Sequence, residues 1–140
     1  MDMLINSLKS NNYKVTPQRI AVYHEIHNSK DHPNAETIHK NLAPKYPSIS
    51  LATVYKSLEL FAKLGIIQII NIDGQSYRYD SNTEKHHHII CNKCNKIEDL
   101  DNKHFACLKS EIENLTQYKI INQNFCFYGI CKSCANSMEN

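Results

Sequence analysis

The feature that most constrains the fold of this chain is a pair of Cys-x-x-Cys motifs in its C-terminal half. Cys91 and Cys94 form the first pair, and Cys131 and Cys134 form the second. Because a tight turn between two cysteines points both sulfurs at one position, two such pairs complete the tetrahedral shell of a zinc ion. Four thiolates leave no open position for water, so the predicted zinc ion is structural and not catalytic. The long gap between the pairs predicts that the metal ties the first strands of a module to its C-terminal tail.

Redox chemistry is the alternative for the cysteine pairs. A thioredoxin-like dithiol comes singly at the step from a strand to a helix, and neither pair here is predicted to precede a helix. The sequence has no apolar run long enough to span a bilayer and no signal-peptide core at its start, which predicts a cytoplasmic protein. In that reducing compartment, the six cysteines are poor candidates for disulfides. Cys107 and Cys126 lie outside the quartet, and we expect both to be buried.

The length and charge of the chain limit its class. With 140 residues it holds one or two small domains, and each buries only a modest core without a metal ion or a partner subunit. A formal net charge of +2 excludes a broadly basic nucleic-acid coat. Any DNA contact must therefore come from a local group of basic and polar side chains.

Residues 1–80 have the helix and hairpin signals of a winged helix-turn-helix domain. Thr16, Asn34 and Ser50 are predicted N-caps, each followed by apolar residues at helical spacing. Asp73-Gly74 lies between two β-branched and aromatic runs, which predicts a hairpin. The predicted helices cover about residues 3–11, 17–28, 34–42 and 51–64, and the hairpin covers about 66–79.

A polar, turn-like segment at about residues 80–85 predicts a hinge before a second domain, residues 86–140. The pattern of this domain predicts strands at about 88–91, 96–100 and 119–128, with one helix between the second and third strands. The fold class is therefore α+β, with a small α/β module after the winged helix. The strand edges and the apolar face of its helix need a cover, which predicts dimerisation through a second copy.

Histidines and aspartates form a second candidate metal site. Alternate residues of a strand share a face, so His86 and His88 can chelate one ion while His87 points away. Asp80 and Asp99 add hard oxygen ligands, and a mixed nitrogen and oxygen set suits iron, manganese or zinc. An idle, solvent-exposed histidine run is the alternative.

The motifs of several enzyme classes are missing. The sequence contains no His-Glu-x-x-His, no deaminase pairing of His-x-Glu with Pro-Cys-x-x-Cys, and no phosphate-binding glycine loop. We therefore expect a protein that is not an enzyme.

Four segments together resemble the ferric uptake regulator family over nearly the whole chain. They are TPQR at 16–19, HPNAETI at 32–38, SISLATVYKSLELF at 48–61 and HHHIICNKC at 86–94. The resemblance implies a cytoplasmic homodimer that binds double-stranded DNA at an inverted-repeat operator when its regulatory metal site is filled. It also implies one structural Zn²⁺ per chain, held by the four cysteines.

Within that family the chain most resembles the peroxide-sensing branch, whose regulatory site holds one Fe²⁺ or Mn²⁺ per chain. The ligands that the resemblance implies are His32, Asp80, His86, His88 and Asp99. Iron-sensing members usually carry glutamate in place of the two aspartates. The resemblance further implies a repressor that hydrogen peroxide releases from DNA, because iron-catalysed oxidation damages His32 or His86.

One departure from the family concerns a further metal site. Many iron and zinc sensors place a histidine on the strand before the last cysteine pair, where this chain has Gln123. This favours peroxide sensing over an iron-responsive or zinc-responsive repressor. A zinc-stapled protein interaction module without sensing is the alternative from another class.

The candidate DNA contacts lie around the fourth predicted helix and the start of the second. Tyr55 and Lys56 face away from the apolar stripe of their helix, where Tyr55 can contact thymine methyl groups. Packing of Tyr55 against the hairpin is the alternative, as is a solvated role for Lys14. The full set of candidate contacts is Lys14, Arg19, Ser50, Ala52, Thr53, Tyr55 and Lys56.

Overall fold

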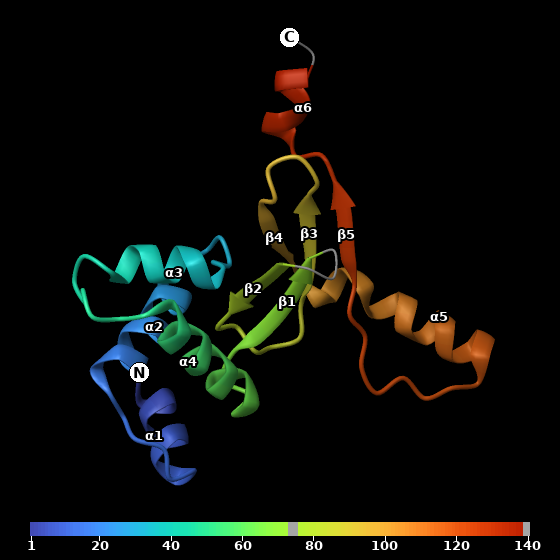
Figure 1. Cartoon of the computed structure of the whole chain (residues 1–140). Helices are drawn as coiled ribbons and strands as arrows, with labels where there is room; N and C mark the ends of the chain where they lie inside the picture. Colours follow the sequence, from blue (N-terminus) through green and yellow to red (C-terminus); the bar gives the residue numbers. More distant parts are fainter. Residues whose placement is uncertain (73–75, 139–140) are drawn as a thin grey trace. The chain divides into compact units, whose positions relative to one another are not determined.

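The computed structural model describes residues 1–72 and 76–138 of an α+β chain (Figure 1). The chain divides into two compact units, Met1–Thr83 and Glu84–Asn140. Within the described residues, no helix has the length and apolar character needed to cross a membrane.

The N-terminal unit contains the helices α1 (Asp2–Ser10), α2 (Pro17–Asn28), α3 (Ala35–Leu42) and α4 (Leu51–Lys63). The three predicted N-caps are confirmed. The side chains of Thr16, Asn34 and Ser50 each accept a hydrogen bond from the backbone N–H three residues later, at 3.3, 2.8 and 3.1 Å. Each bond satisfies one of the N–H groups that a helix start leaves without a partner in the helix.

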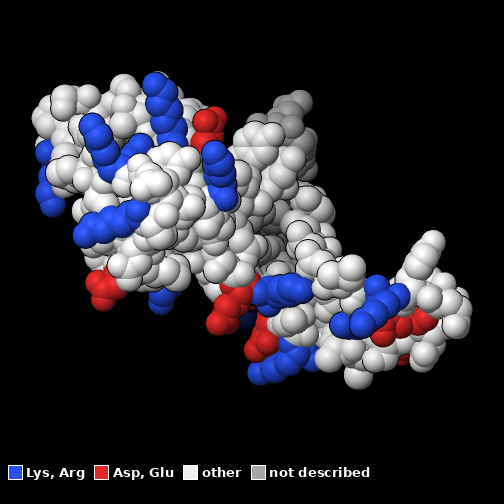
Figure 2. Space-filling model, turned by 90° about the horizontal axis from the view of Figure 1, so that it is seen from below, with Lys and Arg blue, Asp and Glu red and all other residues white. Residues whose placement is uncertain are grey.

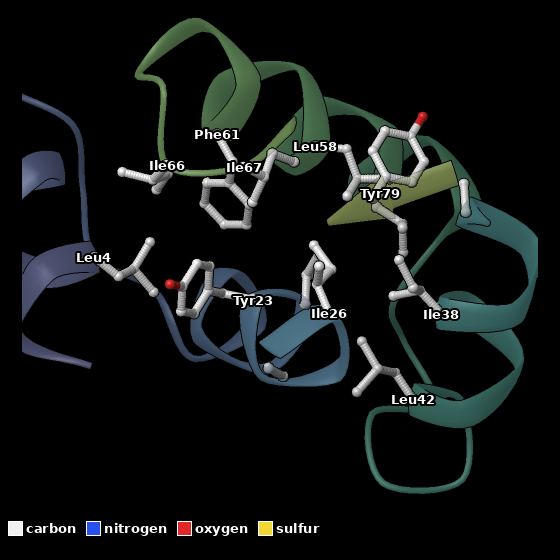
Figure 3. Close-up of a cluster of buried hydrophobic side chains, with 14 of the residues drawn as sticks. Leu4, Tyr23, Ile26, Ile38, Leu42, Leu58, Phe61, Ile66, Ile67 and Tyr79 are labelled. Atoms are coloured by element: carbon white, nitrogen blue, oxygen red, sulfur yellow. The ribbon is translucent and has the colours of Figure 1, made fainter. Parts of the chain in front are cut away.

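The core of the N-terminal unit lies between these helices and the hairpin that follows them (Figure 3). Phe61 of α4 is fully buried and meets the ring of Tyr23 of α2 edge to face, with centroids 5.9 Å apart. Side chains from α1, α2, α3, α4 and the second strand share this core, which holds α4 by one face and leaves its other face open. The labelled members are Leu4, Tyr23, Ile26, Ile38, Leu42, Leu58, Phe61, Ile66, Ile67 and Tyr79.

Two antiparallel strands, β1 (Gln68–Ile72) and β2 (Ser76–Asp80), form the predicted hairpin. Gly65 ends the preceding helix with a φ of 69°, the left-handed conformation that glycine adopts without steric cost. The predicted Asp73-Gly74 turn lies outside the described residues. Gln68 pairs with Asp80, so the last residue of β2 is fixed beside the first residue of β1.

The C-terminal unit is a three-stranded sheet in the order β4-β3-β5. β3 (His87–Cys91) pairs antiparallel with β4 (Ile97–Leu100) and parallel with β5 (Cys126–Gly129). A 3-10 turn, η1 (Asn102–Phe105), leads into α5 (Ala106–Thr116), and α6 (Lys132–Met138) ends the described chain.

Two predictions for this unit are wrong in part. The strand predicted at residues 119–128 begins only at Cys126, because His88 is opposite Cys126 and β3 begins at His87. Earlier residues therefore lie beyond the end of their only partner strand in the described sheet. The second cysteine pair does precede a helix, since α6 begins directly after Cys131.

Cys107 and Cys126 were predicted to be buried, and both are exposed. α5 buries none of its residues within the single chain, so Cys107 has no interior to enter. β5 is an edge strand with exposed side chains, which explains Cys126. The C-terminal unit also exposes large apolar side chains, among them Ile112, Leu115, Tyr118, Ile121, Phe127, Tyr128 and Ile130.

Candidate metal centres

The four cysteines of the two Cys-x-x-Cys pairs come together in the C-terminal unit. Their sulfurs all lie within 4.8 Å of one another, and the sulfurs of Cys94 and Cys131 are 3.8 Å apart. Cys91 ends β3 and Cys131 follows β5, so the parallel pairing of these strands delivers one residue of each pair to the same end of the sheet. The group has the donor type and number of a closed tetrahedral zinc site.

The protonation of the quartet also suits a cation. Hydrogen bonds from the backbone N–H groups of Cys131 and Cys94 lower the pKa of the Cys91 thiol to about 6. Hydrogen bonds with the sulfurs of Cys131, Cys94 and Cys91 raise the pKa of the Cys134 thiol to about 12. Crowded sulfurs that hold one thiolate resist losing further protons, and a bound dication removes that resistance. A redox dithiol needs only two sulfurs, so the gathering of four favours metal binding.

A second group of metal donors lies on the other end of β3. His86 precedes the strand, and His88 is opposite Asp99 of β4 in the register of the sheet. The Nε2 atoms of His86 and His88 are each 3.4 Å from Asp99 Oδ1, and the two imidazole centroids are 4.5 Å apart. The two histidine side chains are under 10% exposed, whereas the Asp99 side chain is 46% exposed. These donors share one face, as strand alternation predicts.

The N-terminal unit holds a further pair of donors. His32 Nε2 lies 3.2 Å from Asp80 Oδ2, and both side chains are under 10% exposed. Asp80 ends β2, and its Oδ1 also accepts a hydrogen bond from the N–H of Asn82 at 2.8 Å. One carboxylate oxygen thus fixes the chain after the strand while the other faces the imidazole. A buried histidine and carboxylate at this distance can serve together as ligands.

The middle histidine of the run has a different role. His87 is fully buried and contacts the rings of Phe105 and Phe125. Its Nδ1 accepts a hydrogen bond from the backbone N–H of Phe125 at 3.0 Å, so Nε2 carries the proton and donates to Asn102 Oδ1 at 3.1 Å. Gln123 Nε2 donates to the same oxygen at 3.2 Å. Gln123, noted in the sequence for replacing a histidine, therefore belongs to a hydrogen-bonded polar group.

Four of the predicted DNA contacts line one hollow on the N-terminal unit. Lys14, Arg19, Thr53 and Lys56 surround a volume of about 420 Å³ between the start of α2 and the open face of α4. Arg19 also donates to the carbonyl of Lys14, which holds its guanidinium at the rim. Figure 2 shows more basic than acidic side chains on the visible face of this unit. Anionic backbone phosphates suit such a hollow.

The other three predicted contacts, Ser50, Ala52 and Tyr55, are exposed but do not line that hollow. Tyr55 is 36% exposed, and its hydroxyl donates to Glu36 Oε1 at 2.8 Å. This hydrogen bond raises the pKa of the Tyr55 phenol. Sequence reasoning missed Glu36, because it lies on α3 and no local spacing connects it to Tyr55.

Comparison with known proteins identifies close relatives. The ferric uptake regulator family matches residues 10–128 of the chain. The peroxide-responsive repressor PerR of Staphylococcus epidermidis is 36% identical over 130 residues, which cover 93% of this chain and 87% of the relative. PerR of Staphylococcus aureus strain USA300 is 35% identical over 130 residues, with 93% and 88% covered.

Solved structures give a similar result. The ferric uptake regulator of Helicobacter pylori, described as having three functional metal binding sites, matches with a TM-score of 0.87 and 27% identity. That match covers 96% of this chain and 90% of the other. The peroxide stress regulator of Campylobacter jejuni matches with a TM-score of 0.71 and 35% identity, covering 94% and 98%.

Proposed function

This chain belongs to the ferric uptake regulator family, and we propose that it is a metal-dependent repressor that senses hydrogen peroxide. The observation that carries the peroxide assignment is the pair of carboxylates that contact histidines, one in each unit. Both are aspartates, Asp80 and Asp99. Relatives named as peroxide-responsive repressors over 93% of the chain support the same assignment.

Each chain binds two metal ions in this proposal, one structural and one regulatory. The cysteine quartet holds a structural Zn²⁺, which its four sulfur donors and closed geometry suit. A regulatory Fe²⁺ or Mn²⁺ takes nitrogen and oxygen ligands, which are harder donors than thiolates. The regulatory ligands we propose are His32, Asp80, His86, His88 and Asp99.

The regulatory metal acts as a clamp between the units. The N-terminal unit supplies His32 and Asp80, and the C-terminal unit supplies the other three ligands. One ion bound by both sets fixes the relative orientation of the units. In a homodimer, which the exposed apolar side chains of the C-terminal unit favour, this orientation sets the spacing of the two α4 helices. Metal and an inverted-repeat DNA site then stabilise the same state.

Hydrogen peroxide releases the regulatory metal by oxidising the histidines that bind it. A ferrous ion held by these residues would promote the oxidation of a neighbouring imidazole by hydrogen peroxide, in which one oxygen atom passes to the ring and the remainder of the peroxide leaves as water. Oxidation adds one oxygen atom to His32 or His86, and an oxidised imidazole is a poorer ligand. Loss of either ligand frees the units and releases the DNA. Manganese-loaded protein resists, because Mn²⁺ does not readily give up an electron to peroxide.

On the DNA, the basic hollow and the open face of α4 have separate roles. Lys14, Arg19, Thr53 and Lys56 contact phosphates or the minor groove around the hollow. Ser50, Ala52 and Tyr55 lie at the exposed start and face of α4, where they approach base edges in the major groove. Glu36 holds the Tyr55 hydroxyl and thereby orients the ring.

The first test is metal content after mild chelation. We expect one zinc retained per chain and a second, exchangeable site that takes Mn²⁺ or Fe²⁺. A Cys94→Ser variant should lose the zinc, and an Asp99→Ala variant should lose only the exchangeable metal. Loss of both metals from wild-type protein under mild chelation would contradict the division into structural and regulatory sites.

The second test concerns DNA and peroxide. The Mn²⁺-loaded protein is used to select duplexes from a random pool, and we expect an inverted repeat. Peroxide should then release Fe²⁺-loaded protein from that duplex but not Mn²⁺-loaded protein, with one added oxygen on the His32 or His86 peptide. Release without added oxygen would refute histidine oxidation, and iron- or zinc-dependent binding that is insensitive to peroxide would favour a metal sensor. Selection of no duplex would favour an interaction module.

A further inference from the structure

We propose that Arg78 is a positioning residue for the regulatory metal, because it holds the turn that presents His32 to Asp80. This inference rests on the proposed function of His32 and Asp80 as metal ligands. Arg78 is itself no ligand, and nothing in its sequence context marks it as part of the site.

The turn needs support because His32 has an unusual backbone conformation. Its φ is 51°, in the left-handed region that a residue with a side chain enters at a cost of roughly 1 kcal/mol or more. His32 lies between Asp31 and Pro33, just before the N-cap of α3. A change of this single residue to a common conformation would redirect the imidazole away from Asp80.

The Arg78 side chain binds this turn through two consecutive carbonyl groups. Its Nε donates to the carbonyl of His32, and a terminal guanidinium nitrogen donates to the carbonyl of Asp31 at 2.6 Å. A guanidinium presents its donors in a fixed planar fork, which lysine does not offer. Hydrogen bonds from a charged donor are also stronger than neutral ones. The Asp31 carbonyl belongs to the peptide plane before His32 and the His32 carbonyl to the plane after it, so the two bonds together hold the planes on both sides of His32.

Strand β2 holds the turn at two further points. The backbone N–H of Tyr79 donates to the carbonyl of Pro33 at 3.1 Å, and the Asp80 side chain meets the His32 imidazole at 3.2 Å. Alternation along the strand puts Arg78 and Asp80 on one side and Tyr79 on the other, in the core. Three successive residues of β2 thus fix the turn, and Arg78 is the one that holds the carbonyl of the ligand itself.

The surroundings of Arg78 suit a fixed structural cation. The side chain is partly buried, which lowers the pKa of its guanidinium, and the nearby carboxylate of Asp31 opposes that shift. An arginine stays charged under these conditions, so its hydrogen bonds persist at every pH at which the protein functions. Loss of a partner that orients a metal ligand typically weakens metal binding about 10- to 100-fold.

The test is a Mn²⁺ titration of the full-length protein with its zinc retained and the exchangeable site emptied. Free aqueous Mn²⁺ is measured by its electron paramagnetic resonance signal. We expect Arg78→Met to bind Mn²⁺ about 10- to 100-fold more weakly than wild type. Arg78→Lys keeps the charge but not the planar fork of donors, so its Mn²⁺ affinity should lie between those of wild type and Arg78→Met. Lys40→Met removes an exposed cation from α3 of the same unit and should bind like wild type.

Zinc content and the thermal unfolding midpoint of the manganese-free protein separate positioning from a purely structural role. Positioning predicts weaker Mn²⁺ binding by a variant that keeps its zinc and remains folded. If Arg78→Met does not fold, the comparison rests on Arg78→Lys. Wild-type Mn²⁺ affinity in either folded variant would overturn the role of Arg78 while leaving the regulatory site intact. No Mn²⁺ binding by wild-type protein would overturn both the regulatory site and this inference.

Discussion

Replacement of Cys94 by serine is expected to unfold the C-terminal unit and to leave the N-terminal unit folded. The two units differ greatly in what they bury. The N-terminal core draws on four helices and a hairpin, with Phe61, Leu4 and Leu8 fully buried. Among the described residues of the C-terminal unit, Ile90 and Ile97 are the only aliphatic side chains that are buried.

The magnitudes explain why the metal decides the outcome. Full burial of one isoleucine stabilises a fold by about 1.5–3 kcal/mol, so the two together contribute roughly 3–6 kcal/mol. A structural zinc ion contributes on the order of 10–16 kcal/mol. Each residue that becomes ordered costs about 1–2 kcal/mol of backbone entropy. Without zinc, the two buried isoleucines cannot hold three short strands together.

Hydrogen exchange followed by mass spectrometry measures this effect unit by unit, with zinc content determined on the same sample. In Cys94→Ser, amides of β3 and β5 should lose their protection, and amides of α2 and α4 should keep theirs. Cys107→Ser is the matched control, since that cysteine is exposed and lies outside the quartet. Wild-type protection of β3 and β5 in a zinc-free Cys94→Ser protein would refute the reasoning.

Two further predictions concern the N-terminal unit. Burial raises the pKa of Tyr79 to about 12, so the unfolded chain ionises first as the pH rises above about 10, the usual tyrosine value, and stability falls there. Between pH 9 and pH 11, the free energy of unfolding in urea should fall less for Tyr79→Phe than for wild type. Equal falls for the two proteins would contradict the role of Tyr79 ionisation. Phe61→Ala removes a fully buried ring that packs on Tyr23 and should cost about 3–5 kcal/mol in the same assay; a cost under about 1 kcal/mol would contradict the assignment of Phe61 to the core.

Local patterns in the sequence predicted the helices and the hairpin strands of the N-terminal unit with small errors, but they placed the start of β5 too early and missed α6. N-cap residues such as Thr16 and Ser50 act within one turn of their own helix, so their effect can be inferred from neighbouring residues. The late start of β5 could not be inferred this way, because its length depends on where β3 begins, far away in the chain. The exposure of Cys107 likewise depends on whether anything covers α5.

The metal sites divide in the same way. The spacing of the cysteine pairs predicts the zinc site, and strand alternation predicts that His86 and His88 share a face. His32 came from resemblance alone, since no spacing connects it to Asp80, which lies 48 residues away. Arg78 and Glu36 act through contacts between distant segments, and only coordinates could reveal them.

The run of three histidines makes the register of β3 decisive for metal affinity. As the strand is folded, His86 and His88 face Asp99 while His87 is enclosed by Phe105. A register shift of one residue would exchange the two faces of the strand. His87 alone would then face Asp99, and His86 and His88 would point into the aromatic interior. Because residues 86–88 are all histidine, these three side chains alone do not favour one register over the other. By enclosing His87, Phe105 and Phe125 therefore select the register that presents two histidines to the metal, although neither ring is a ligand.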